Sequence, residues 1–201
     1  MIRVMIAEDV RLLRESLAAV LELEDDITVV AAVERGDEVV AAALEARPEV
    51  ALLDIDLPAL DGISAAELLR DQVPGCRPVI LTGLTRPGHL RRALAAGAAG
   101  FLLKHAVPGT IVDAIREVAA GGRVIDPQLA LAALETPDNP LPAREIDVLR
   151  LAATGAGPEE IAETLFLSVG TVRNYLSSAI TRLDARNRVD AIRIATDQGW
   201  L

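Results

Sequence analysis

The chain has 201 residues, 51% of them hydrophobic, which is enough to form the cores of one or two domains. Its net charge of −10 is uneven, because residues 1–140 hold 13 basic and 22 acidic side chains whereas residues 141–201 hold 7 and 8. The acidic first part would repel nucleic acid, while five arginines between residues 171 and 193 concentrate positive charge near the C-terminus.

No apolar stretch approaches the ~20 residues that a membrane-spanning helix needs, which argues against membrane insertion. The N-terminal segment reaches the acidic pair Glu8-Asp9 too early to be a secretory signal. The single cysteine, Cys76, excludes an intramolecular disulfide and suits a reducing compartment. We therefore expect a cytoplasmic protein.

Residues 1–121 alternate between strand-like and helix-like segments. Continuous apolar runs predict strands covered on both faces near residues 3–8, 27–33, 50–54, 78–82 and 100–103. Helical patterns follow them near residues 10–23, 36–46, 62–72, 87–96 and 109–120. Five β–α units of this kind predict an α/β domain with a doubly wound, five-stranded parallel sheet.

The first predicted helix has a stripe of apolar residues at helical spacing, which we expect to face the core: Val10, Leu13, Leu17, Val20 and Leu21. It also carries apolar residues outside this stripe: Leu12, Ala19 and Leu23. These extra residues fit an interface with another molecule and additional core packing equally well.

Residues 122–140 are predicted to be a linker with a short helix at 127–135, ending in the proline-containing stretch 136–140. From Leu141 the pattern is helical throughout, with short turns between predicted helices at 142–154, 158–166, 169–183 and 187–198. Residues 141–201 therefore predict a small all-α domain. Its helix pair at 158–183 has the dimensions to enter a DNA groove.

Four of the predicted strands end in polar residues: Glu8-Asp9, Asp54, Thr82 and Lys104. Ligands of doubly wound sheets bind beyond the carboxyl ends of the strands, so these residues are expected to meet. Lys104 is the only lysine, beside 19 arginines, which suggests that its position requires a compact ammonium. A single acid at a strand end is usually a helix cap or a solvated loop, but four matched strand ends favour a site.

This combination of residues suits the transfer of a phosphoryl group. Three carboxylates at one edge need a cation, and a cluster of hard oxygen ligands suits Mg²⁺. Thr82 and Lys104 offer a hydroxyl and an ammonium to phosphoryl oxygens, and a carboxylate oxygen of Asp54 could attack phosphorus to form an aspartyl phosphate.

Residues 1–120 resemble the receiver domain of bacterial two-component response regulators. The resemblance rests on Glu8-Asp9, Asp54, Pro58 and Gly62, Thr82-Gly83, and Phe101 to Lys104. It implies that Asp54 is the phosphoacceptor, and that Asp9, Asp54 and the Asp56 carbonyl bind Mg²⁺, with Glu8 acting mainly through water. It further implies that Lys104 and Thr82 contact the phosphoryl group and that Phe101 changes rotamer, although Phe101 lacks the more usual tyrosine hydroxyl.

The predicted helix at 169–183 has a core-facing side with Val172, Leu176, Ile180 and Leu183. Its other side shows small polar residues and arginines, which suit a major groove: Thr171, Arg173, Asn174, Ser177, Ser178, Thr181 and Arg182. Residues 140–201 resemble the helix-turn-helix domain of LuxR/FixJ-type regulators. The resemblance implies that Arg173, Asn174 and Ser177 face bases or phosphates, that Thr171 faces a phosphate, and that the final helix pairs two copies on DNA.

The sequence therefore predicts a DNA-binding transcription regulator of the NarL/FixJ family rather than an enzyme. Its expected partners are a sensor histidine kinase, double-stranded DNA and, on activation, a second copy of the chain. An alternative is an Mg²⁺-dependent phosphohydrolase with an aspartyl-phosphate intermediate, because Asp54-Ile55-Asp56 resembles the nucleophile motif of haloacid-dehalogenase-type phosphatases. A third possibility is DNA binding without a phosphate switch.

Overall fold

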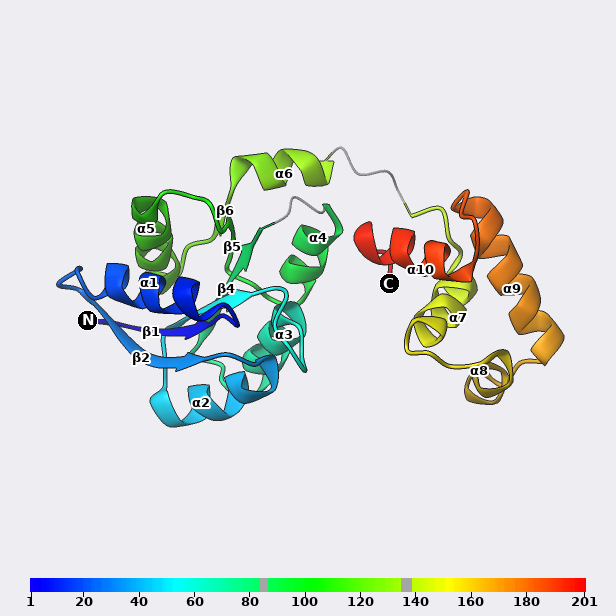
Figure 1. Ribbon diagram of the computed structural model, residues 1–201, viewed down its shortest axis with the longest axis horizontal. Helices are drawn as coiled ribbons and strands as arrows, with labels where there is room; N and C mark the ends of the chain where they lie inside the picture. Colours follow the sequence, from blue (N-terminus) through cyan, green and yellow to red (C-terminus); the bar gives the residue numbers. More distant parts are fainter. Residues whose placement is uncertain (84–86, 135–138) are drawn as a thin grey trace. The chain divides into compact units, whose positions relative to one another are not determined.

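The computed structural model describes residues 1–83, 87–134 and 139–201, which form an α/β unit and a helical unit (Figure 1). The α/β unit contains one sheet with the strand order β2-β1-β3-β4-β5-β6, and every pair of neighbours is parallel. The strands are β1 (Ile2–Ala7), β2 (Ile27–Val33), β3 (Val50–Asp54), β4 (Arg77–Thr82), β5 (Gly100–Leu103) and β6 (Val124–Ile125).

The predicted fold class is confirmed, but the sheet has six strands where the sequence predicted five. The sixth, β6, lies among residues expected to be linker and pairs Val124 with Gly100 and Ile125 with Phe101. A strand of two residues is too short for its apolar pattern to be distinguished from that of a loop. The predicted linker stretch 136–140 lies partly outside the described residues.

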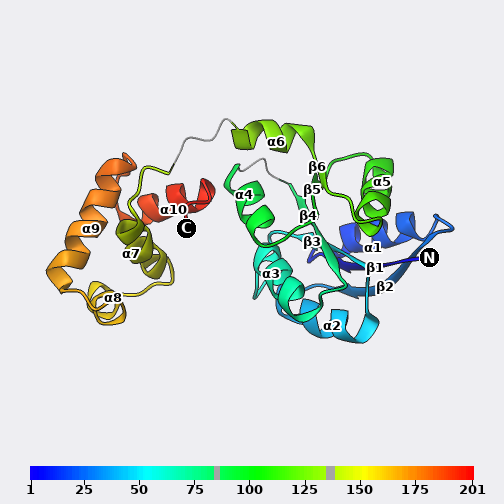
Figure 2. The ribbon, with the colours of Figure 1, turned by 180° about the vertical axis from the view of Figure 1, so that it is seen from behind.

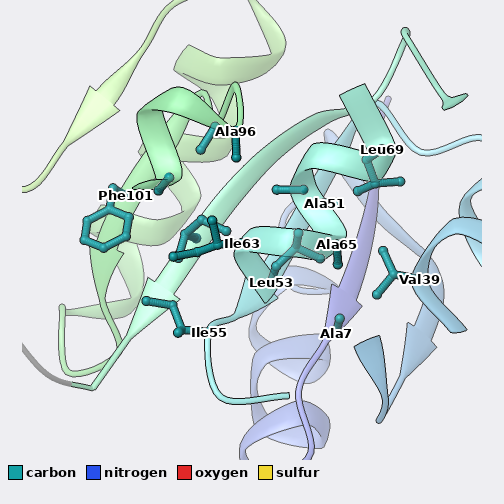
Figure 3. Packing of buried hydrophobic residues seen from close by; sticks show 14 of the residues in the cluster. Ala7, Val39, Ala51, Leu53, Ile55, Ile63, Ala65, Leu69, Ala96 and Phe101 are labelled. Atoms are coloured by element: carbon teal, nitrogen blue, oxygen red, sulfur yellow. The ribbon is translucent and has the colours of Figure 1, made fainter. Parts of the chain in front are cut away.

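Helices cover both faces of the sheet (Figures 1 and 2). They are α1 (Arg11–Leu21), α2 (Val39–Ala46), α3 (Gly62–Gln72), α4 (Pro87–Ala95), α5 (Pro108–Ala119) and α6 (Pro127–Leu134). The predicted helix at 36–46 is divided, because a 3-10 helix, η1 (Gly36–Glu38), precedes α2. On one face the sheet packs against α2, α3 and α4 around residues such as Leu53, Ile63 and Phe101 (Figure 3).

On the other face the sheet packs against α1 and α5. The apolar stripe of α1 is less buried than the sequence predicts. Leu21 is 1% exposed, whereas Leu13, Leu17 and Val20 are only partly buried and Val10 is 52% exposed. Leu17 and Leu21 pack against the core of this face, and both also line an open pocket between α1 and α5 together with Leu13 and Val20.

The helical unit consists of α7 (Ala143–Ala153), α8 (Pro158–Leu165), α9 (Val169–Arg182) and α10 (Arg188–Asp197). In α9, Val172, Leu176 and Leu183 just beyond its end are buried, as their spacing predicts, and Ile180 is partly buried. The helix begins after the N-cap residue Ser168, whose hydroxyl accepts a hydrogen bond from the Thr171 amide at 3.0 Å. On the other side of α9, Thr171 is only partly buried and Arg173 is exposed, so this side does not belong to the core.

The described ranges contain no helix with the length and apolarity needed to cross a bilayer.

Gly62 lets α3 begin very close to the end of β3. A Cβ atom at this position would lie 1.9 Å from the carbonyl oxygen of Asp54. The Gly62 amide also donates to the Ile55 carbonyl at 2.9 Å, and the Asp61 carboxylate caps the helix by accepting from the Ile63 and Ser64 amides. The start of α3 thereby fixes the backbone that carries Asp54.

Gly62→Ala is expected to lower the free energy of unfolding of the α/β unit by about 1–3 kcal/mol, because the new methyl group must displace backbone. Urea denaturation followed by circular dichroism measures the change. The control is Gly75→Ala, since a Cβ at Gly75 meets nothing within 4 Å. Equal stability of the two variants would contradict the close approach of α3 to β3.

Asp190 ties α10 to the turn that precedes it. Its carboxylate accepts hydrogen bonds from the Arg186 amide and Nε, both at 3.1 Å, and from Arg193 at 3.0 Å. The hydrogen bond from the Arg186 side chain, then that from the Arg186 amide and that from Arg193, hold the pKa of Asp190 well below its usual range. A carboxyl group with a lowered pKa stabilises the fold above its unfolded-state pKa.

We therefore expect the helical unit to lose stability as the pH falls below about 4, the ordinary pKa of an aspartyl group in an unfolded chain. Asp190→Asn should have a lower Tm than the parent at pH 7, and the difference should shrink as the pH falls. Calorimetry between pH 7 and pH 3 tests this, with Asp147→Asn as a control because Asp147 pairs with Arg144 only at 3.7 Å. A pH-independent difference would refute the role of the Asp190 charge.

Candidate functional site

Carboxylates from two neighbouring strands meet at the carboxyl edge of the sheet. Glu8 and Asp9 directly follow β1, and Asp54 is the last residue of β3, which pairs with β1. One oxygen of each of these three residues lies within 4.8 Å of the others. Glu8 and Asp54 are buried, at 1% and 3% exposed, whereas Asp9 is exposed to solvent. The sequence-based prediction of an acidic cluster here agrees with this geometry.

Lys104 contacts two of these carboxylates from the end of β5. Its Nζ lies 2.8 Å from Glu8 Oε2 and 2.9 Å from Asp54 Oδ2. The Lys104 amide donates to the Thr82 carbonyl at 2.8 Å, which continues the pairing of β4 with β5 and aims the side chain across the edge of the sheet. The ends of β1, β3 and β5 are thus joined by one ammonium.

The charges in this cluster shift one another's proton affinity. Burial raises the pKa of Glu8, and the neighbouring charge of Asp54 adds to that effect, although the hydrogen bond from Lys104 opposes it. Burial works against the charged form of Lys104, but its hydrogen bonds to Glu8 and Asp54 outweigh that cost and raise its pKa. Lys104 therefore remains an ammonium beside the Glu8 and Asp54 carboxyl groups.

Arg14 holds the backbone of the acidic loop, a contact that the sequence did not predict. From α1 its guanidinium donates to the carbonyl of Glu8 at 2.5 Å and of Asp9 at 3.4 Å, and it pairs with Glu34 at 3.4 Å. The spacing of six residues between Glu8 and Arg14 belongs to no helical or strand period, so the sequence held no signal for this contact.

The other residues predicted for this site lie in different surroundings. Thr82 is buried at the end of β4, one strand from Asp54, at 2% exposure. Asp56 is exposed in the turn after β3. Phe101 is fully buried in the hydrophobic cluster shared by the sheet, α3 and α4, and so lies in the core and not beside the carboxylates (Figure 3).

The helical unit presents a second candidate surface on α9. Arg173, Asn174 and Ser177 are exposed, and Thr171 is partly buried at the start of the helix. Arg173 pairs with Glu159 of α8 at 3.2 Å, with both side chains about two-thirds exposed, at 66% and 67%. A pair this exposed contributes little to stability, so Arg173 is available to another anion.

Buried polar contacts, which the sequence did not indicate, hold α9 from behind. Glu145 of α7 is 4% exposed, and it accepts a hydrogen bond from Ser178 Oγ at 2.7 Å and pairs with Arg182 Nε at 3.4 Å. A further contact joins α10 to α7 and the loop that follows it: Arg188 donates to the carbonyls of Ala152 and Ala156 at 3.0 and 2.9 Å. These contacts join residues 32 to 37 positions apart, beyond any local sequence pattern.

Comparisons with known proteins match both units. Residues 4–116 match the response regulator receiver domain, and residues 139–195 match the bacterial regulatory proteins of the luxR family. Over 201 residues the chain is 42% identical to the uncharacterized transcriptional regulatory protein YvfU of Bacillus subtilis, covering all of both chains. It is 40% identical to the transcriptional regulatory protein DesR of the same organism, covering 100% of this chain and 99% of that one.

Among solved structures, the crystal structure of the response regulator ChrA, from a haem-sensing two-component system, is similar with a TM-score of 0.60 and 32% identity. The similarity covers 100% of this chain and 98% of that one. The receiver and LuxR-type domains thus occur together, in the same order, in relatives that regulate transcription. The chain belongs to the NarL/LuxR family of two-component response regulators, which join a receiver domain to a LuxR-type DNA-binding domain.

Proposed function

We propose that this response regulator is switched by phosphorylation of Asp54, with a sensor histidine kinase as donor and Mg²⁺ as cofactor. The observation that carries the proposal is the Asp54 carboxylate itself. It is 3% exposed, lies 2.9 Å from the Lys104 ammonium and shares a cluster with Glu8 and Asp9. A nucleophile, a cation for the phosphoryl oxygens and oxygen ligands for a metal are thereby close together.

The donor set fits Mg²⁺, because the oxygens of Glu8, Asp9 and Asp54 lie within 4.8 Å of one another and the side chain of Asp9 is open to solvent. We assign direct ligation to Asp9, Asp54 and the carbonyl of Asp56, and a water-mediated contact to Glu8. When bound, the ion offsets the negative charge of the transferring phosphoryl group.

In the transfer step, a carboxylate oxygen of Asp54 attacks the phosphorus of a phosphohistidine. The new O–P bond forms as the N–P bond breaks, and the bonding electron pair remains on the imidazole nitrogen, which takes a proton. Lys104 then contacts the phosphoryl oxygens, since its ammonium already lies at Asp54 Oδ2. Thr82, at the end of β4, offers a hydroxyl from the neighbouring strand.

The phosphoryl group adds negative charge and acceptor oxygens at the end of β3. Thr82 and Lys104 turn toward these oxygens, and the side chain of Phe101 responds in the core beside α4. The altered surface promotes pairing of two copies, and two α9 helices then contact adjacent half-sites of double-stranded DNA, about 34 Å apart. Thr171, Arg173, Asn174 and Ser177 carry the DNA contacts.

The phosphohydrolase alternative lacks a corresponding observation. It gives no role to the helical unit, and the relatives described above are transcriptional regulators.

Incubation with acetyl phosphate and Mg²⁺ should add the mass of one phosphoryl group to the intact chain. Asp54→Ala should remain unmodified, because it lacks the attacking oxygen, and the parent should remain unmodified when Mg²⁺ is chelated. Intact-mass spectrometry measures all three samples.

The matched control is Asp25→Ala. Asp25 is exposed and lies just before β2, at the edge of the sheet opposite the carboxyl ends that hold the cluster, so this variant should be phosphorylated like the parent. A phosphoryl group on the Asp54→Ala variant would show that another residue is the phosphoacceptor. Rapid release of phosphate without a modified chain would favour the phosphohydrolase.

Arg173→Ala is expected to weaken binding to a DNA fragment selected by the parent protein, at a cost of about 1–3 kcal/mol if Arg173 contacts a base. Fluorescence anisotropy at one salt concentration measures Kd. Arg150→Ala serves as the control, because Arg150 is an exposed arginine on α7 of the same unit and lies away from α9 in the sequence. Equal loss in both variants would indicate a general charge effect and overturn the role of Arg173.

A further inference from the structure

Two cationic side chains contact the acidic cluster in different ways. Lys104 binds the carboxylates of Glu8 and Asp54 directly. Arg14, on α1, binds backbone instead: its Nη1 donates to the Glu8 carbonyl at 2.5 Å and to the Asp9 carbonyl at 3.4 Å. Arg14 therefore holds two residues of the cluster through their carbonyl groups and leaves their carboxylate oxygens to a cation.

The junction between β1 and α1 needs a contact of this kind. The helix begins after Val10, whose apolar side chain cannot cap it. The Val10 amide donates to Glu8 Oε1 at 3.2 Å, and the Glu8 amide donates to the Val33 carbonyl at 3.1 Å. Both of these hydrogen bonds hold Glu8, and the contact with Arg14 extends the support to Asp9.

The surroundings of Arg14 show which of its contacts matters most. Its side chain is 16% exposed, whereas that of its ion-pair partner Glu34 is 63% exposed. A charged hydrogen bond that is shielded from water is stronger than one in solvent. The 3.4 Å pair with the exposed Glu34 contributes little, so the bond to the backbone is the main interaction.

We propose that Arg14 is a positioning residue for the metal site, which fixes the backbone of Glu8 and Asp9 so that the Asp9 carboxylate is held ready to bind Mg²⁺. This role rests on the proposed function, because it takes Asp9 and Asp54 as metal ligands. A ligand that is already held in place loses less conformational freedom when the ion binds. Groups that orient metal ligands typically change the metal affinity at least tenfold when they are removed.

The charge of Arg14 acts in the opposite direction from its hydrogen bonds. A positive group beside the site repels a divalent cation, so loss of the charge alone would strengthen metal binding. Loss of the hydrogen bonds releases the loop and weakens metal binding. The two effects predict changes of opposite sign, which makes the positioning role measurable.

Arg14→Met in the full-length protein should bind Mn²⁺ about tenfold more weakly than the parent. Mn²⁺ stands in for Mg²⁺ because both prefer oxygen ligands in octahedral geometry, and electron paramagnetic resonance of the free ion gives the Kd. An affinity equal to or higher than that of the parent would overturn the proposal. Should Arg14→Met fail to fold, as judged by circular dichroism, Arg14→Lys replaces it and must also bind more weakly, because an ammonium lacks the planar set of donors.

The matched control is Arg11→Met. Arg11 lies on the same helix, and its partner is Glu15 at 2.7 Å, with the Arg11 side chain 81% exposed. Its removal deletes the same charge without releasing the acidic loop, so this variant should bind Mn²⁺ at least as tightly as the parent. Equal weakening in Arg11→Met and Arg14→Met would overturn the positioning role.

Phosphorylation by acetyl phosphate supplies a second readout. Arg14→Met should need about tenfold more Mg²⁺ for half-maximal phosphorylation. Its rate at saturating Mg²⁺ should stay close to that of the parent, because Asp54 and Lys104 are unchanged. A lower saturated rate with an unchanged Mg²⁺ requirement would mean that Arg14 acts on the acceptor and not on the metal site, and would overturn the proposal.

The parent protein separates failure of this inference from failure of the proposed function. If the parent binds Mn²⁺ and is phosphorylated, and Arg14→Met matches it in both assays, only the positioning role is wrong. If the parent neither binds Mn²⁺ nor accepts a phosphoryl group, the proposed function is wrong and the role of Arg14 is overturned with it.

Discussion

An ammonium shared by two buried carboxylates is the interaction on which the α/β unit depends. Glu8 and Asp54 lie at the ends of adjacent strands with almost no exposure to water, and Lys104 reaches both from the end of β5. A buried charge without a partner costs several kcal/mol, so the Lys104 ammonium offsets much of the cost of burying this pair. The parallel order of the sheet supplies the geometry, because it brings the carboxyl ends of β1, β3 and β5 to one edge.

The helical unit also buries carboxylates, but its exposed recognition-type helix, α9, carries arginine instead of acidic residues. Its two buried carboxylates lie behind and between the helices, where Glu145 contacts α9 and Asp190 contacts Arg186 in the turn before α10 and Arg193 within α10. Arginine and small polar residues remain on the outer side of α9. Buried acids thus fix the helices, while the outer side of α9 keeps positive and hydrogen-bonding groups.

Much of this organisation could be predicted because it follows local patterns. Apolar runs indicated the first five strands, and the polar residues that end them indicated the acidic cluster. The features that the sequence did not predict depend on contacts between separate segments. They are the hydrogen bond from Arg14 to the acidic loop, the contact of Glu145 with α9, and the pairing of β6 with β5. The α1 stripe shows a further limit, since helical spacing predicts which side is apolar but not how much of that side is buried.

The presence of a single lysine has a practical consequence for chemistry in solution. Apart from the N-terminal amine, Lys104 is the only primary amine in the chain, and its side chain is 20% exposed. Because its two carboxylate partners raise its pKa, little of the nucleophilic free amine exists at neutral pH. The rate at which an acylating reagent modifies Lys104 therefore depends on the charge of its carboxylate partners. Measuring that rate follows changes in the acidic cluster without a label elsewhere in the chain.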